Sequence, residues 1–168
     1  LDTAVPIETM QNMKKFKIPG FEILPISVNH SIVDSMALAI DTPAGKVLHT
    51  GDFKIDPSPF FGSSMDLEVF SKIGEEGLLL LLSDSTNVER HDHSLSEEII
   101  YRRFEQLFVE SQGLVVVSMF ASNVGRLGQV FELSEKLGKK IALAGRSMDQ
   151  CVELANQAGY LKNTHGIL

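Results

Sequence analysis

Apolar and polar positions follow two different periods along this chain, with a change near residue 85. Before that point, short apolar and β-branched runs separated by turn residues predict strands at 22–28, 36–41 and 46–50, and the leucine-rich run 77–83 predicts a buried strand. The turn formers in TPAGK separate the second and third of these runs, so those two strands should form an antiparallel hairpin. We expect only strands and turns in this part, with a loop in the Pro- and Gly-containing stretch before the leucines.

After residue 85 the pattern alternates between helices and strands. SLSEEIIYRRFEQLFVES carries apolar residues at helical spacing behind a capping sequence, either the Ser94–Glu97 box or Ser96. LVVVSMF then predicts a strand buried on both faces, and NVGRLGQVFELSEKLG, KKIALAG and SMDQCVELANQAG predict a helix, a strand and a helix. This β-α-β-α order implies parallel strands with right-handed crossovers, which is the start of a doubly wound sheet.

Two side chains that can bind a metal flank the predicted hairpin. His30 lies in the loop before its first strand, and Asp52, within TGDFK, directly follows its second strand. Pairing about the TPAGK turn sets residues near 36 opposite residues near 51, so both side chains should lie at the same edge of a sheet. That geometry suits two ligands of one metal site.

Composition is compatible with such a site and limits the alternatives. A chain of 168 residues with 43% hydrophobic residues can form one ordinary domain or two small ones. Its longest apolar run, the leucines at 78–82, is far shorter than the roughly 20 residues that span a bilayer, so we expect no membrane partner. The single Cys151 excludes an intrachain disulfide and a thiolate zinc cluster, which fits a reducing cytosol and leaves His and carboxylate ligands. The net charge of −7 argues against a broad nucleic-acid-binding face, although it does not exclude a nucleic-acid substrate.

Four stretches, VNHSIVDS, HTGDFKID, LLSDSTN and SMFASNVGRLGQV, together resemble the β-CASP branch of the metallo-β-lactamase superfamily, and the ribonuclease J family most closely. They occur in the family's order and extend from about Glu22 to about Gln150. The resemblance implies an α/β fold, with part of a metallo-β-lactamase-type β-sheet layer at 1–89 and part of a β-CASP doubly wound parallel β-α-β sheet at 90–168. It also implies a cytoplasmic hydrolase that uses two zinc ions to cleave RNA phosphodiester bonds, at 5′ ends or internally.

The resemblance assigns roles to three residues. His30 would be a nitrogen ligand of one zinc, Asp52 the carboxylate that bridges both, and Asp84 the acidic residue that orients a histidine near the leaving group. Paired zinc ions lower the pKa of a bridging water toward ~7 and hold the attacking and leaving oxygens of a phosphodiester. Each residue also has a simpler interpretation, because His30 can be a loop histidine bonded to backbone, Asp52 a turn cap and Asp84 the start of a helix. As an ordered set, we interpret them as a site.

The SMFASN loop joins a predicted strand to a predicted helix. Ser122 or Asn123 can cap that helix, and its free amides suit an anion. In ribonuclease J the corresponding loop holds RNA phosphates, with a histidine where this chain has Gly125. The resemblance therefore implies Ser122, Asn123 and Arg126 as RNA phosphate contacts. Arg126 and Arg146, each at a helix start, can supply counter-charge or form local salt bridges.

Four other side chains with metal-binding or nucleophilic groups are not assigned to the site. His91 and His93 in RHDHS have no Asp-His pair after them, and we interpret RHDHS as a surface loop. His49 alternates with Leu48 on a strand and is expected to be a packed or edge histidine. Cys151 is expected to be a small buried helix residue.

The family's H-x-H-x-D-H motif, which supplies most zinc ligands, is absent from the chain. We therefore interpret the chain as an internal fragment with an incomplete zinc site, inactive alone, and expect a homo-oligomer because half a lactamase-type sheet leaves apolar surface uncovered. Three other functions stay open: a metallo-β-lactamase-fold hydrolase of small esters, a non-catalytic nucleic-acid-binding module, and a nucleotide-binding domain. The last is disfavoured because neither G-x-G-x-x-G nor G-x-x-x-x-G-K-[ST] occurs.

Overall fold

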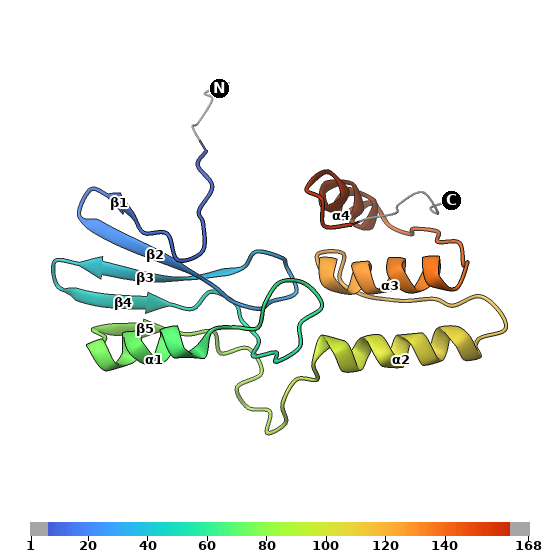
Figure 1. Ribbon diagram of the computed structural model, residues 1–168, viewed down its shortest axis with the longest axis horizontal. Helices are drawn as coiled ribbons and strands as arrows, with labels where there is room; N and C mark the ends of the chain where they lie inside the picture. The colour runs from blue at the N-terminus through green and yellow to red at the C-terminus, as the bar shows by residue number, and fades with distance from the viewer. Residues whose placement is uncertain (1–6, 162–168) are drawn as a thin grey trace. The chain divides into compact units, whose positions relative to one another are not determined.

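The computed structural model describes residues 7–161 (Figure 1). Within them the chain forms two compact units. The first contains the residues up to Val28, then Asp34–Phe53 and Met65–Glu89, and the second contains Asn29–Val33, Lys54–Ser64 and the residues from Arg90 on. No helix among residues 7–161 is long and apolar enough to cross a membrane.

The first unit is built on a five-stranded sheet. Its strands, in spatial as well as chain order, are β1 (Phe16–Ile18), β2 (Phe21–Ser27), β3 (Met36–Thr42), β4 (Gly45–His49) and β5 (Leu80–Leu82). The first four pair antiparallel, and β5 pairs parallel to β4. The predicted hairpin is confirmed by the pairing of β3 with β4, which runs from Leu38↔His49 to Thr42↔Gly45.

One helix of the first unit was not predicted. Helix α1 (Leu67–Glu76) begins after Asp66, whose carboxylate accepts hydrogen bonds from the backbone N–H groups of Glu68 (3.1 Å) and Val69 (3.4 Å). The expectation of strands and turns alone before residue 85 is therefore wrong. The missed signal is an N-cap aspartate in front of apolar residues at helical spacing. One of them, Ile73, packs into the core that the sheet contributes, with Ile26, Val28, Ala37, Ala39 and Leu48.

The leucine run forms a strand as predicted, but its predicted burial is wrong. Leu79 is 61% exposed and Leu81 is 53% exposed. β5 lies at the edge of the sheet, where β4 is its only neighbour among the described residues. Sequence composition identified a strand, and the burial of a strand depends on what covers it.

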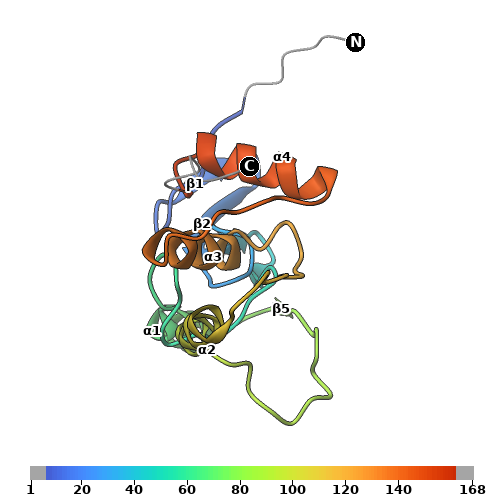
Figure 2. The same ribbon diagram turned by 90° about the vertical axis from the view of Figure 1, so that its right-hand side faces the viewer.

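The second unit contains the three predicted helices. They are α2 (Glu97–Glu110), α3 (Val124–Lys136) and α4 (Arg146–Gln157), and α3 lies between the other two (Figure 2). The predicted cap of α2 is confirmed, because the Ser96 hydroxyl accepts a hydrogen bond from the Ile99 N–H (3.4 Å). Helices α3 and α4 contribute to one hydrophobic core, together with Leu161, which lies after α4. The core consists of Leu127, Phe131, Val152, Ala155 and Leu161.

The two strands predicted for the second unit are not formed among the described residues. LVVVSMF is extended without strand pairing, and it leaves Leu114 91% and Phe120 87% exposed instead of burying both faces. KKIALAG contains only a single bridge position, at Ile141. The doubly wound parallel sheet expected at 90–168 is therefore absent from the described part of the chain, because an apolar extended segment becomes a strand only beside a partner. The described structure is mixed α/β with one five-stranded sheet.

Candidate active site at the ends of strands β4 and β5

The parallel strands β4 and β5 end side by side, with His49 paired to Leu82 at the last position. The chain then runs into two polar loops, one containing Asp52 and the other containing Asp84. Sites in α/β proteins form where parallel strands end together. Here the two loops line a hollow of about 520 Å³, whose lining residues are His49, Gly51, Asp52, Leu81, Leu82, Ser83, Asp84 and Ser85. Two sequence-predicted site residues, Asp52 and Asp84, therefore line one hollow.

The residue before Asp52 adopts a conformation that favours glycine. Gly51 has a φ of 61°, and a Cβ added there would lie 2.9 Å from the Met36 carbonyl oxygen. Its N–H donates to His49 Nδ1 (3.0 Å), and its carbonyl oxygen accepts from Thr50 Oγ1 (2.7 Å). Both polar backbone groups of Gly51 are thus held by the side chains of the two residues that precede it, which fixes the backbone directly in front of Asp52.

Asp84 links its own loop to the loop that follows β4. Its Oδ1 accepts a hydrogen bond from the Thr86 N–H (2.7 Å), and its Oδ2 accepts a longer one from the Phe53 N–H (3.4 Å). The Asp84 N–H donates to Thr50 Oγ1 (2.9 Å). Residues after Asp84 form a turn, so the alternative that it starts a helix is wrong. Asp84 is half-buried, whereas Asp52 is exposed.

His30 follows strand β2, which ends at the sheet edge where β4 also ends. At that edge Ser27 of β2 pairs with Met36. Gly51 is also close to Met36, because a Cβ built on Gly51 would lie 2.9 Å from the Met36 carbonyl oxygen. The predicted placement of residues near 36 opposite residues near 51 is therefore confirmed. His30 itself belongs to the short segment grouped with the second unit. Its role as a zinc ligand stays a prediction.

The described residues do not complete a zinc site by themselves. A catalytic zinc usually takes three protein ligands and a water. Nowhere in residues 7–161 do three His, Cys, Asp or Glu side chains come together in a way that could hold a metal ion. Asp52 is an exposed residue that lines the hollow, and a carboxylate is a ligand type that zinc binds.

His49 lines the hollow, a position that the sequence did not indicate. It was expected to be a packed or edge histidine, and it is an exposed residue at the last position of β4 that lines the hollow. The signal for this place is its spacing from Gly51. A histidine two residues before a glycine with positive φ can accept the glycine N–H, as Nδ1 does here.

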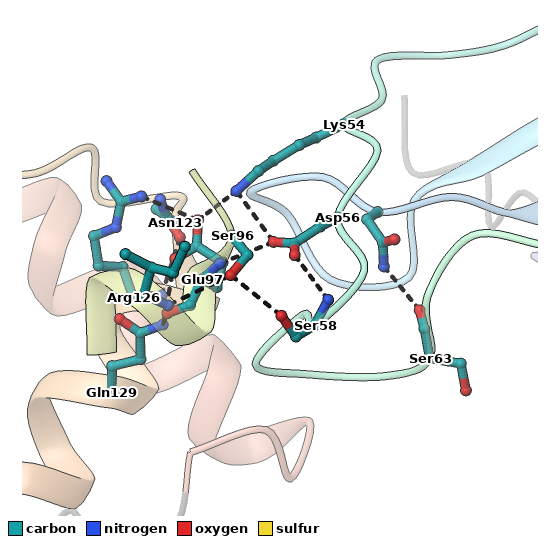
Figure 3. Close-up of polar contacts among 11 residues, drawn as sticks. Lys54, Asp56, Ser58, Ser63, Ser96, Glu97, Asn123, Arg126 and Gln129 are labelled. Carbon is teal, nitrogen blue, oxygen red and sulfur yellow. Dashed lines mark hydrogen bonds and ion pairs between the residues drawn. The ribbon is translucent and has the colours of Figure 1, made fainter. Parts of the chain in front are cut away.

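The second unit contains a polar network around the start of α2, shown in Figure 3. At its centre Asp56, only 2% exposed, accepts hydrogen bonds from the backbone N–H groups of Glu97 (2.9 Å) and Ser58 (3.0 Å) and pairs with Lys54 Nζ (3.2 Å). Burial raises the pKa of the Asp56 carboxyl, but the two N–H donors and Lys54 outweigh burial and lower that pKa below its usual value. The carboxylate therefore stays charged near neutral pH.

Glu97 connects the same network to helix α3. Its Oε1 accepts from Lys54 Nζ (3.0 Å) and pairs with Arg126 (3.1 Å). Gln129, fully buried, donates to the Glu97 carbonyl oxygen (3.0 Å) and to its Oε2 (3.3 Å). We call the set Lys54, Asp56, Ser58, Ser96, Glu97, Arg126 and Gln129 the Asp56–Glu97 network. Its two cations and two anions balance.

The loop predicted to contact RNA lies at the start of α3. Asn123 rather than Ser122 caps the helix, because its Oδ1 accepts from the Arg126 N–H (3.0 Å), and Ser122 is exposed. The Arg126 guanidinium forms the salt bridge to Glu97, which is the alternative that the sequence left open. Arg146 is exposed at the first position of α4.

His91, His93 and Cys151 belong neither to the lining of the hollow nor to the Asp56–Glu97 network. His91 and His93 are exposed in the loop before α2, as expected of a surface loop. Cys151 lies on helix α4 as expected, but it is half-buried and not buried as predicted.

Comparisons with known proteins agree on one family. Residues 112–168 match the family model described as ribonuclease J, beta-CASP domain. Ribonuclease J of Helicobacter pylori is 46% identical over 136 residues, which cover 81% of this chain and 20% of that protein. Ribonuclease J of Sinorhizobium meliloti is 37% identical over 98% of this chain and 29% of its own length, and that of Synechocystis is 40% identical over 96% and 24%.

The chain spans only a fifth to under a third of the length of these relatives. Among solved structures, a crystal structure of a protein of unknown function from Enterococcus faecalis matches with a TM-score of 0.60 at 15% identity, over 92% of this chain and 36% of that one. This likeness concerns the fold alone.

Proposed function

From the premise that this chain is ribonuclease J-like, with β-CASP sequence in its C-terminal third, we propose that the whole protein is a cytoplasmic, zinc-dependent ribonuclease. It would hydrolyse RNA phosphodiester bonds from 5′ ends, internally, or both. One observation carries the proposal. In a chain 46% identical to a ribonuclease J over 136 residues, Asp52 and Asp84 line one hollow at the ends of two parallel strands.

The proposal gives Asp52 and His30 to the metal. Asp52 has an exposed carboxylate with two oxygen donors, so it can be shared between two zinc ions, and His30 would add a nitrogen ligand. The described residues form no complete ligand set, so the other ligands must come from elsewhere in the whole protein.

Asp84 would act through a histidine. Carboxylates that accept the N–H of a histidine fix its tautomer and ring orientation. The Asp84 carboxylate is suited to this task because Thr86 and Phe53 N–H groups hold it in one place (2.7 and 3.4 Å). The proposed partner is a histidine near the leaving group of the RNA.

RNA phosphates would bind at the start of α3. The exposed Ser122 hydroxyl and the positive end of the helix dipole favour an anion there, next to the cap Asn123. Arg126 would contribute by exchanging Glu97 for a phosphate. Glu97 would keep Lys54 and Gln129 as partners during that exchange. The exposed leucines of β5 support the further proposal of a homo-oligomer.

The test is a substrate and metal comparison on the whole protein. Single-stranded RNA, a thioester and a lactone are offered to the enzyme as purified, after dialysis against a chelator, and after re-addition of zinc. We expect cleavage of RNA alone, lost with the chelator and restored by zinc. Hydrolysis of the thioester or lactone without cleavage of RNA would instead identify a small-ester hydrolase of the same fold.

A further inference from the structure

Thr50 connects the two loops of the candidate active site through a single hydroxyl. The residue is only 6% exposed. Its Oγ1 donates to the Gly51 carbonyl oxygen (2.7 Å) and accepts from the Asp84 N–H (2.9 Å). One partner directly precedes Asp52, and the other belongs to Asp84 itself. A buried hydroxyl thus joins the two proposed site carboxylates through their backbones.

The Thr50 hydroxyl lies just past the last paired residues of strands β4 and β5. Strands β4 and β5 are already held by their pairing and by the hydrogen bond from the Thr50 N–H to the Leu82 carbonyl oxygen (2.9 Å). After these strands end, two hydrogen bonds link the Asp52 loop to the Asp84 loop. The Asp84 N–H donates to the Thr50 hydroxyl (2.9 Å), and the Phe53 N–H donates to Asp84 Oδ2 (3.4 Å). The shorter of these two links depends on the Thr50 side chain, so it can be removed without touching the ladder.

We propose that Thr50 is a positioning residue for RNA cleavage, whose hydroxyl sets the placement of the Asp52 loop relative to the Asp84 loop. The inference rests on the proposed function of those two carboxylates. A hydroxyl has one proton to donate and lone pairs to accept, so it satisfies the Gly51 carbonyl and the Asp84 N–H at once. Without it, a half-buried N–H must find water, and the Asp84 loop shifts. Displacements of about 1 Å at a catalytic group can cost ~100-fold in rate.

Two substitutions separate the hydroxyl from the shape of the side chain. Thr50→Val keeps the branched shape without the hydroxyl, and Thr50→Ser keeps the hydroxyl. In the whole protein we expect Thr50→Val to lower kcat for RNA at least about tenfold, with KM changed by no more than about twofold. Thr50→Ser should stay within about threefold of wild type.

Thr42→Val is the matched control. The Thr42 hydroxyl likewise donates to a carbonyl oxygen, that of Gly45 (2.8 Å), and accepts from backbone N–H groups, those of Ala44 (3.1 Å) and Gly45 (3.2 Å). These bonds lie at the hairpin turn, away from the ends of β4 and β5. Loss of this hydroxyl should lower stability and leave kcat unchanged. A role of Thr50 in stability alone predicts that both valine variants behave alike.

Hydrogen exchange of the Asp84 amide in the 168-residue chain gives a readout that needs no activity. We expect at least about tenfold faster exchange in Thr50→Val, and wild-type exchange in Thr50→Ser and Thr42→Val. Unchanged Asp84 exchange, or unchanged kcat in Thr50→Val, overturns the proposal. If the wild-type protein cleaves no RNA, the proposed function fails. The exchange rates then decide separately whether Thr50 holds the Asp84 loop.

Discussion

Replacing Asp56 with asparagine should destabilise the second unit by about 3 kcal/mol at neutral pH. Asp56 is 2% exposed, accepts hydrogen bonds from two backbone N–H groups and pairs with Lys54. Asparagine keeps the shape but loses the charge and one acceptor oxygen, so an N–H of Glu97 or Ser58 must face an amide NH₂ group. Hydrogen bonds to a charged group contribute about 1.5–3 kcal/mol each. Lys54 would still pair with Glu97 (3.0 Å) in the variant. The lost stability should therefore be closer to that of one such hydrogen bond than to that of three.

The loss should depend on pH with a definite sign. The folded state lowers the pKa of Asp56, so the stability from its charge is present above the ordinary carboxyl pKa of about 3.9 and disappears as pH falls through the folded value. The difference between wild type and Asp56→Asn should therefore be complete above about pH 5 and shrink below about pH 4.

Urea unfolding at pH 7 and near pH 3.5, followed by circular dichroism, measures this difference. Urea is preferred because guanidinium would screen the ion pairs. Asp92→Asn, an exposed aspartate in the loop before α2, removes the same charge and should change stability by less than about 0.5 kcal/mol. An Asp56→Asn loss below about 0.5 kcal/mol at pH 7, or one of equal size at both pH values, would refute the reasoning.

Three further predictions concern the sheet edge, the RNA loop and the metal. Gly51→Ala places a Cβ 2.9 Å from the Met36 carbonyl oxygen and should cost about 1–3 kcal/mol in urea unfolding, clearly more than Gly20→Ala, where φ is also positive but no atom lies within 4 Å. Ser122→Ala with Arg126→Ala should weaken RNA binding more than zinc binding, most strongly at low salt; equal RNA affinity at ~50 mM salt would leave the loop only a cap. The 168-residue chain alone should carry no stoichiometric dinuclear zinc and cleave no RNA, and two tight zinc ions by elemental analysis would contradict the assigned ligands.

Local signals predicted the parts of the fold that depend on neighbours in sequence. The β3–β4 hairpin follows from a two-residue turn between β-branched runs, and α2 follows from its Ser96 cap. Helix α1 was missed although its Asp66 cap is a local signal. The other failures occurred where distant partners decide the outcome. LVVVSMF has strand composition without a paired neighbour among the described residues, and Leu79 is exposed because nothing described covers β5.

The site shows the same division. Asp52 and Asp84 were found from short motifs, and strand pairing placed them together at one hollow. Thr50 was not found, because its proposed role depends on the positive φ of Gly51 and on a hydrogen bond from the N–H of a residue 34 positions later. The Asp56–Glu97 network likewise joins residues 41 positions apart, a separation over which sequence periodicity carries no information.

RNA cleavage by the Asp52→Asn variant of the whole protein is the most direct test of the proposed function. The substituted amide would keep the shape of the exposed Asp52 side chain and lose the charge that two zinc ions require. We expect kcat to fall by about 100-fold or more and zinc content to drop, while the protein stays folded and its RNA affinity stays at the wild-type value. Asp92→Asn should cleave normally. Near-normal cleavage by Asp52→Asn, with its zinc content unchanged, would contradict the assignment of this residue to the metal centre.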